Sequence, residues 1–419
     1  MPPMTIRHTA ATTPRSTPAA RTGALLLFAG APVLGAAAPL AMTIAVTRGL
    51  GATGWASLAL ALAIGNASTT VAELGWGVVG PQQVARHPDS RHDLYRSALA
   101  SKLVALVVIT PLAAVLAFLL APVDPVGAAF VGAGGAMASL SPAWFFVGAG
   151  RPGLTLVCDT LPRLVLSLGA AWLIVRGASL AFYGTALVTS SVVAWILASV
   201  IAGLPLVPRA RDFTRAPETL RRQAVVVSGR AVSIVYTALP SVALGALAPG
   251  AVALYAAVDR PLRMGVVVLG AIPARLQAYL GVVDRRLAQH RARNALLINA
   301  GMGVAAALVF GAGMPAVWGV LFADAVPMDA ALIALGSLLV AVMCASRGFG
   351  IVLVAFDASN DITRAILAAA AVALALVPAL SLAAGATGAV VAVIVAEVTA
   401  LAVQGLCVCR RWHATVPAR

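Results

Sequence analysis

Apolar runs of about 20 residues recur about twelve times between Gly23 and Val408, with charged residues, Gly and Pro in the gaps between them. A helix of this length is what crosses a hydrocarbon core of ~30 Å. The pattern predicts helices over residues 24–47, 55–80, 98–120, 126–148, 154–175, 179–203, 224–247, 252–280, 296–322, 329–356, 365–384 and 387–408. The sequence therefore predicts an all-α integral membrane protein with about twelve transmembrane helices.

Composition agrees with a chain that is almost entirely membrane-embedded. Hydrophobic residues make up 61% of the 419 residues and charged residues only 10%, whereas about a quarter of the residues of a soluble domain are charged. The net charge of +15 is spread over short loops. In a soluble protein this charge would indicate nucleic acid, but here it indicates a lipid bilayer as the partner and no nucleic acid.

The basic residues also predict the orientation. They gather in every second gap, mainly in segments 86–102, 209–222, 285–293 and 410–419, while the alternate gaps contain only Arg48 and Arg176. Short cytoplasmic loops are enriched in Lys and Arg. We therefore expect a cell membrane protein whose two termini are both cytoplasmic.

The longest inner gap divides the chain into two halves. Residues 204–223 are rich in Pro and Arg and separate six predicted helices from six. This predicts a six-helix lobe over 23–203, a cytoplasmic inter-lobe loop over 204–223 and a second six-helix lobe over 224–408, arranged around a central cavity. The remaining ends, 1–22 and 409–419, are predicted as cytoplasmic tails, the first of them disordered.

Charged residues inside the predicted helices are the strongest functional signal, because each costs about 2.5–3.5 kcal/mol to insert. Asp259, Arg260 and Arg263 lie on one face of the eighth helix, and Asp259 and Arg263 have the i,i+4 spacing of an ion pair. Arg260 is then left for another role. Arg230, in the seventh helix, either faces the same cavity or extends to the cytoplasmic interface.

Two further groups of polar residues have more than one interpretation. Asn66, Thr69, Thr70 and Glu73 share one face of the second helix. There Glu73 either binds a coupling proton or cation with their help, or pairs with an arginine of the other half. The remaining pairs are interpreted as charge partners: Asp159 with Arg163 inside the fifth helix, and Arg347 with Glu397 across the second half.

No catalytic or metal-binding pattern is present. The sequence has no phosphate-binding glycine loop, nucleophile elbow or zinc helix. Cys407 and Cys409 have no neighbouring His, and the acidic cluster Asp357–Asp361 is interpreted as a helix cap. We therefore expect no enzymatic activity, catalytic residue, cofactor or metal.

Several segments resemble the polysaccharide biosynthesis flippases, the O-antigen-type oligosaccharide flippases of the multidrug/oligosaccharidyl-lipid/polysaccharide exporter superfamily. The similarity follows the order of the predicted helices. It rests on Gly49–Leu60, Ala72–Gly77, Pro81–Arg86, Pro142–Gly148 with Asp159 and Arg163, Leu254–Arg260 and Gly385–Ala389.

The resemblance implies a bacterial transporter that flips a polyprenyl-diphosphate-linked oligosaccharide from the inner to the outer leaflet by alternating access. Arg230, Arg260 and Arg263 match the cavity arginines that meet the diphosphate in that family, and polysaccharide-assembly proteins are implied as partners. A cation-coupled multidrug or small-molecule antiporter of the same architecture, using Glu73, is the alternative. A membrane-embedded transferase is a more remote third.

Overall fold

The computed structural model describes residues 18–280, 285–356 and 358–414; side chains are not described for 18–36 and for most of 222–236 and 271–285. Every regular element in the described part of the chain is a helix. The protein is thus an all-α membrane protein, as its hydropathy pattern predicts.

The first half forms a bundle that begins with a long, bent helix. Gly51 has φ 68° and ψ −164°, so α1 turns back there and provides two of the predicted spans. Glycine suits this position because a positive φ costs it nothing. The helices of this half are α1 (Pro18–Ala72), α2 (Trp76–Arg86), α3 (Arg91–Leu120), α4 (Pro125–Met137), α5 (Ala143–Gly148), α6 (Gly153–Thr155), α7 (Leu161–Val175) and α8 (Ala181–Ala202).

The second half is also helical, and its bend lies in its last helix. The last helix turns at Ala384 and Gly385, where Gly385 has φ 54°. The helices are α9 (Ala210–Leu247), α10 (Val252–Leu269), α11 (Ala271–Leu280), α12 (Arg285–Phe322), α13 (Ala330–Ala355) and α14 (Ser359–Ala414).

Eight helical stretches in the described chain are long and apolar enough to cross a membrane. Two of them, over 37–86 and 360–412, are about twice the necessary length and contain the two bends. Each therefore corresponds to two spans. With α9, and with α10 joined to α11, the structure provides the twelve predicted spans.

Several helices extend further than the hydropathy pattern predicts. Residues 210–223, predicted as part of the inter-lobe loop, form the first turns of α9, where the Asp212 carboxylate accepts a hydrogen bond of 2.8 Å from the Arg209 amide. Likewise α12 begins at Arg285 and α14 continues to Ala414. Hydropathy identifies only the part of a helix that lies within the bilayer. Arg is a good helix former, so an Arg-rich helix can continue beyond the bilayer.

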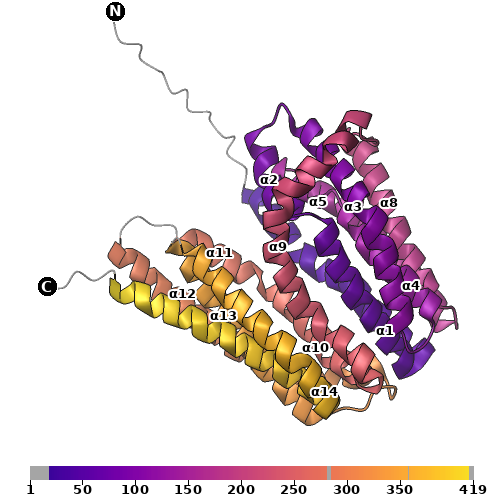
Figure 1. Ribbon diagram of the computed structural model, residues 1–419, viewed down its shortest axis with the longest axis vertical. Coiled ribbons are helices and arrows are strands. Elements are labelled where there is room, and N and C mark those ends of the chain that lie inside the picture. Colours follow the sequence, from indigo (N-terminus) through magenta and orange to yellow (C-terminus); the bar gives the residue numbers. More distant parts are fainter. Residues whose placement is uncertain (1–17, 281–284, 357, 415–419) are drawn as a thin grey trace, which may run out of the picture.

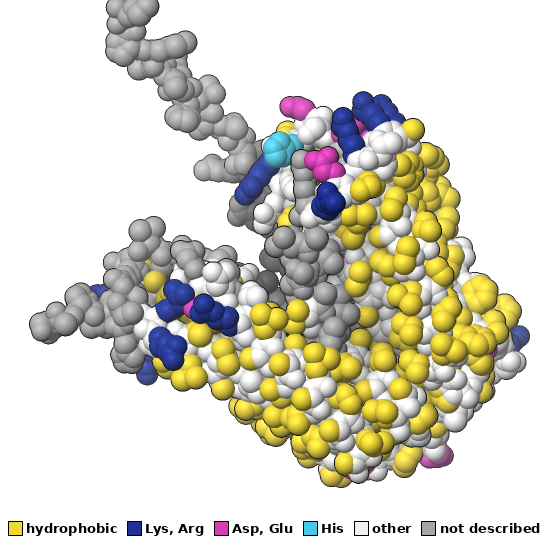
Figure 2. Space-filling view, viewed as in Figure 1, with side chains coloured by type: hydrophobic (Ala, Val, Ile, Leu, Met, Phe, Trp, Pro, Cys, Tyr) yellow, Lys and Arg dark blue, Asp and Glu magenta, His cyan; other side chains and the backbone are white. Residues whose placement is uncertain are grey.

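The two halves form separate bundles that meet at one end (Figure 1). Helices α1 to α8 form one bundle and α10 to α14 the other, and the bundles diverge toward the ends that carry α2 and α11. Figure 2 shows Lys and Arg side chains gathered mainly at the two diverging ends, with hydrophobic side chains along the flanks. The apolar flanks are the surface expected to face lipid.

Side chains of α1 connect the bundles where they meet. The Thr47 hydroxyl donates a hydrogen bond of 2.9 Å to the Leu321 carbonyl of α12, and the Trp55 indole N–H donates one of 3.1 Å to the Ala253 carbonyl of α10. The Trp55 ring also packs against Phe322, with 5.8 Å between centroids. These buried contacts close the interface at the converging end.

Candidate functional site

A cavity of about 510 Å³ lies between the two bundles, and we call it the central cavity. Helix α1 provides one wall on both sides of its bend, α7 and α8 provide another, and α10 faces them from the second bundle. The lining is apolar except for a small number of polar and charged side chains. Its members are Ala38, Pro39, Met42, Thr43, Trp55, Leu58, Leu62, Asn66, Gly135, Ala138, Arg163, Ser167, Tyr183, Leu187, Arg260, Arg263, Met264, Val267 and Val268.

Arg263 is held by an ion pair within α10. Its Nε lies 2.8 Å from both carboxylate oxygens of Asp259, and the Tyr255 hydroxyl donates a hydrogen bond of 3.2 Å to the same carboxylate. The Asp259 side chain is only 7% exposed, whereas that of Arg263 is 26% exposed. The acid is therefore covered, and the guanidinium is the group presented to the cavity.

Arg260 has a different environment. Its Nη2 donates a hydrogen bond of 2.5 Å to the Ala59 carbonyl of α1, in the other bundle. Among the described side chains, no carboxylate lies within 4.0 Å of it. A second cavity of about 210 Å³, which we call the side cavity, also contacts Arg260 and Arg263, together with Asn66, Thr70, Thr237, Ser241 and Asp259. The two guanidiniums thus stand between two cavities.

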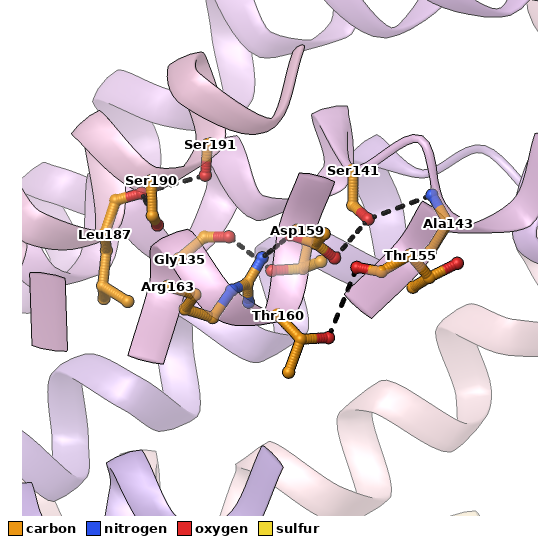
Figure 3. Close-up of polar contacts among 11 residues, drawn as sticks. Gly135, Ser141, Ala143, Thr155, Asp159, Thr160, Arg163, Leu187, Ser190 and Ser191 are labelled. Carbon is orange, nitrogen blue, oxygen red and sulfur yellow. Dashed lines mark hydrogen bonds and ion pairs between the residues drawn. The ribbon is translucent and has the colours of Figure 1, made fainter. Parts of the chain in front are cut away.

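The first bundle contributes a third arginine, Arg163, which the sequence predicts only as half of a helix-internal ion pair. The pair is present, with 3.1 Å between Arg163 Nη2 and Asp159 Oδ1 (Figure 3). Ser141 donates a hydrogen bond of 2.7 Å to the other oxygen of Asp159. Asp159 is thus held by both Ser141 and Arg163, and the Arg163 side chain remains 34% exposed and lines the central cavity.

A local distortion explains why the sequence did not reveal this placement. Residues 156–160 form a π-helical turn directly before α7, and the Thr160 hydroxyl contacts the Thr155 carbonyl at 3.5 Å (Figure 3). A π turn adds a residue to the helical repeat and rotates the next part of the helix about its axis. A helical projection with a constant 100° per residue therefore gives the wrong direction for the Arg163 side chain. The neighbouring Pro162 is the one sign in the sequence that the helix is irregular here.

The structure separates the four polar residues predicted as a coupling group in the second span. Asn66 and Thr70 line the side cavity. The Thr69 hydroxyl instead donates to the Gly65 and Gly135 carbonyls, where α1 packs on α4. Glu73 lies in the turn between α1 and α2 and acts electrostatically on the buried Lys102.

The other predicted site residues lie elsewhere in the second bundle. Arg347 Nη1 donates a hydrogen bond of 2.8 Å to the Val266 carbonyl of α10, close to the break at Gly270, rather than to Glu397. Glu397 is buried in α14. Arg230 lies on α9, but its side chain falls outside the described residues, so its predicted place in the cavity is not addressed by the structure.

The central cavity is suited to an anion. Three guanidiniums reach it, and both nearby carboxylates, Asp159 and Asp259, are already ion-paired with two of them. Arginine stays charged in a low-dielectric site and presents a fixed fork of donors that matches phosphate oxygens. The apolar remainder of the wall, including Met42, Leu58 and Met264, would contact nonpolar parts of a bound molecule.

Comparisons with known proteins agree with the helical plan. The sequence model of the family described as "Polysaccharide biosynthesis protein" matches residues 24–275. A comparison with curated proteins gave no match.

Two solved structures cover nearly the whole chain. The lipid II flippase MurJ in an inward closed conformation is similar at TM-score 0.65 and 12% identity, over 92% of this chain and 87% of that one. A multidrug resistance MATE family transporter of the MOP superfamily in its inward-facing conformation is similar at TM-score 0.60 and 16% identity, over 90% and 96%. At these identities the likeness concerns the fold. With the family match, it shows that this multi-pass membrane protein belongs to the polysaccharide biosynthesis protein family and has the fold of MOP-superfamily transporters.

Proposed function

We propose that the protein flips a polyprenyl-diphosphate-linked oligosaccharide from the inner to the outer leaflet of the cell membrane, for surface polysaccharide biosynthesis. The observation that carries the proposal is the convergence of Arg163, Arg260 and Arg263 on one cavity between the lobes. A diphosphate offers several charged oxygens to these donors, and each charge-assisted hydrogen bond contributes about 1.5–3 kcal/mol before desolvation is deducted.

The shape of the cavity supports a substrate with two kinds of surface. The arginines occupy a small part of a mostly apolar wall, so a headgroup with phosphates would bind at α7 and α10 while a lipid chain remains among apolar helices. A free, soluble sugar phosphate has no nonpolar part that could contact such a wall. The arrangement therefore favours a lipid-linked anion.

Alternating access fits the two-bundle arrangement. The diverging ends carry most of the basic side chains shown in Figure 2, and the positive-inside bias supports a cytoplasmic position for these ends. The headgroup would enter from that side, and rocking of the lobes would then close the basic ends and break the Thr47 and Trp55 contacts at the opposite end.

The test is flipping in vesicles that contain purified protein and a fluorescent polyprenyl-diphosphate oligosaccharide. We expect the Arg163, Arg260 and Arg263 triple alanine variant to lose flipping while it remains folded in the membrane. Arg176→Ala is the matched control, because Arg176 lies on Trp172, 3.9 Å from the ring centroid, away from the cavity. Full activity of the triple variant would overturn the proposal.

A cation-coupled multidrug antiporter is the second candidate, and the largely apolar cavity wall favours it. The net positive charge of the cavity is unfavourable for a cationic drug, so the candidate substrate would be neutral or anionic. Transport of such a compound, driven by an ion gradient and without any flipping of the lipid-linked sugar, would favour this candidate over the flippase.

A further inference from the structure

The side cavity differs from the central cavity in the chemistry of its wall. Its volume is about 210 Å³, and seven of its ten described lining residues are polar or charged. The other three are alanines, Ala63, Ala67 and Ala238. The central cavity, of about 510 Å³, has a mostly apolar wall. The two cavities therefore suit groups of different polarity.

Two polar side chains of the side cavity are available to a ligand. Ser241 on α9 is only 5% exposed, yet its hydroxyl makes no hydrogen bond within the described chain. The Asn66 carboxamide on α1 likewise has no partner there, because Thr70 donates its hydrogen bond of 3.0 Å to the Asn66 backbone carbonyl. Burying a polar group without a partner costs free energy. A hydroxyl and a carboxamide together offer donors and acceptors, as the recognition of a sugar hydroxyl requires.

The charges of the side cavity disfavour a cation. Arg260 and Arg263 both line it, whereas Asp259 is the one carboxylate among its described lining residues and is already ion-paired with Arg263. The wall is therefore net positive, which is unfavourable for Na⁺ or a cationic drug. The cavity is also smaller than the roughly 300–1,000 Å³ of a site for a drug-sized molecule. An uncharged group with several hydroxyls, about as large as one sugar ring, meets both conditions.

The two cavities are joined by shared residues. Asn66, Arg260 and Arg263 line both of them. A ligand held by the two guanidiniums can therefore extend into the apolar cavity on one side and the polar cavity on the other. In a lipid-linked sugar the diphosphate stands between a hydrocarbon chain and the first sugar. The order of apolar wall, arginines and polar wall matches the order of these three parts.

We propose that the side cavity binds the first sugar of the substrate, the ring attached to the diphosphate, through Asn66 and Ser241. The inference rests on the proposed function and adds a site that distinguishes the sugar-bearing lipid from the bare lipid diphosphate. A site that hydrogen-bonds a substrate hydroxyl discriminates against a ligand without it, because the polar groups of the site then stay unpaired.

The experiment measures equilibrium binding of fluorescent lipids to the purified protein in detergent. The ligands are polyprenyl diphosphate alone and the same lipid carrying one glucose or one N-acetylglucosamine, and the readout is the ratio of their affinities. We expect the wild type to bind at least one sugar-bearing lipid about tenfold more tightly than the bare lipid, the equivalent of two hydrogen bonds. Ser241→Ala should lower this ratio about threefold. Ala67→Leu, which fills the side cavity, should lower it to about one.

Thr399→Ala is the matched control and should keep the wild-type ratio, because the Thr399 hydroxyl donates to the Val395 carbonyl within α14 and lines neither cavity. A wild-type ratio of one with both sugars, while the bare lipid binds, would overturn this inference and leave the proposed function standing. A ratio unchanged by Ser241→Ala would also overturn it, and this variant decides the matter if Ala67→Leu does not fold. If the wild type binds none of the three lipids, the proposed function fails and this inference fails with it.

Discussion

Arg260 of α10 donates a hydrogen bond to the carbonyl of Ala59 in α1, so the cavity arginine that forms no ion pair among the described side chains also joins the two bundles. The Ala59 carbonyl is a weak partner for a guanidinium compared with a phosphate oxygen, because it carries no net charge. An anion in the cavity would therefore compete for Arg260 and loosen one contact between the lobes. Substrate binding and lobe movement would share this residue.

The first prediction concerns Arg260 itself. Arg260→Ala should lower the flipping rate about tenfold to a hundredfold, the equivalent of one lost charge-assisted contact of about 1.5–3 kcal/mol. Arg260→Lys should recover only part of this loss, because a point charge cannot reproduce the fork. Flipping in vesicles, corrected for the amount of protein, measures both. Equal rates for Lys and Arg at this position would show that charge alone is required.

The second prediction concerns Asp259, which holds Arg263. Asp259→Asn removes a negative charge next to the expected headgroup but leaves a side chain that can still accept from Arg263. We expect a smaller loss of flipping than with Arg260→Ala, together with tighter binding of a diphosphate lipid in an equilibrium assay. Weaker binding in this variant would mean that the position of Arg263 matters more than the local charge.

The third prediction tests the packing that supports the cavity wall. Gly65 of α1 and Gly135 of α4 touch through their backbones, and a Cβ on Gly135 would lie 2.5 Å from the Gly65 Cα. Gly135→Ala should therefore destabilise the protein by about 1–3 kcal/mol. Gly169→Ala on α7, where a Cβ would meet nothing within 4 Å, should be neutral or stabilising by about 0.5–1 kcal/mol. Unfolding midpoints in detergent compare the two, and similar midpoints would contradict the close contact.

The sequence was sufficient for the helical plan because hydropathy and bilayer thickness act on each span separately. It placed both bends near glycines, Gly51 and Gly385, whose positive φ values the structure shows. Helix ends outside the bilayer were missed, as at residues 210–223, because a charged amphipathic segment and a loop have similar mean hydropathy.

The candidate site was only partly predictable for a related reason. Arg260 and Arg263 stand out in the sequence because inserting a charged residue into the membrane costs free energy. A charged residue within an apolar run can be recognised from the sequence alone. The place of Arg163 in the cavity cannot be predicted from a regular helix, because the direction of its side chain depends on the π-helical turn before α7. The burial of Lys102 is not visible in the sequence, because the Ser139 carbonyl that accepts its hydrogen bond lies far away along the chain.

The fourth prediction concerns the contacts that close the converging end. Trp55→Phe removes the hydrogen bond to the Ala253 carbonyl but keeps an aromatic ring beside Phe322, and should cost about 1 kcal/mol. The population opened at that end should then rise about fivefold. A cysteine at Thr43, which lines the central cavity, would report this as faster labelling from outside. Trp172→Phe, on an exposed ring, is the control, and an unchanged labelling rate in Trp55→Phe would exclude this contact as a gate.

The last prediction concerns orientation, on which the direction of flipping depends. If the basic, diverging ends face the cytoplasm, an impermeant thiol reagent applied to intact cells should not reach the native Cys409, which is exposed near the end of α14. A cysteine at Phe213, a 39% exposed position on the extended first turns of α9, should behave in the same way. A cysteine at Val123, 40% exposed in the predicted outer turn before α4, should react at once. Permeabilising the cells should make the first two sites reactive without changing the third. Reaction of the Phe213 cysteine in intact cells would show that the orientation is opposite to the predicted one. All three positions are assigned to a side of the membrane by the same alternation of basic and neutral loops.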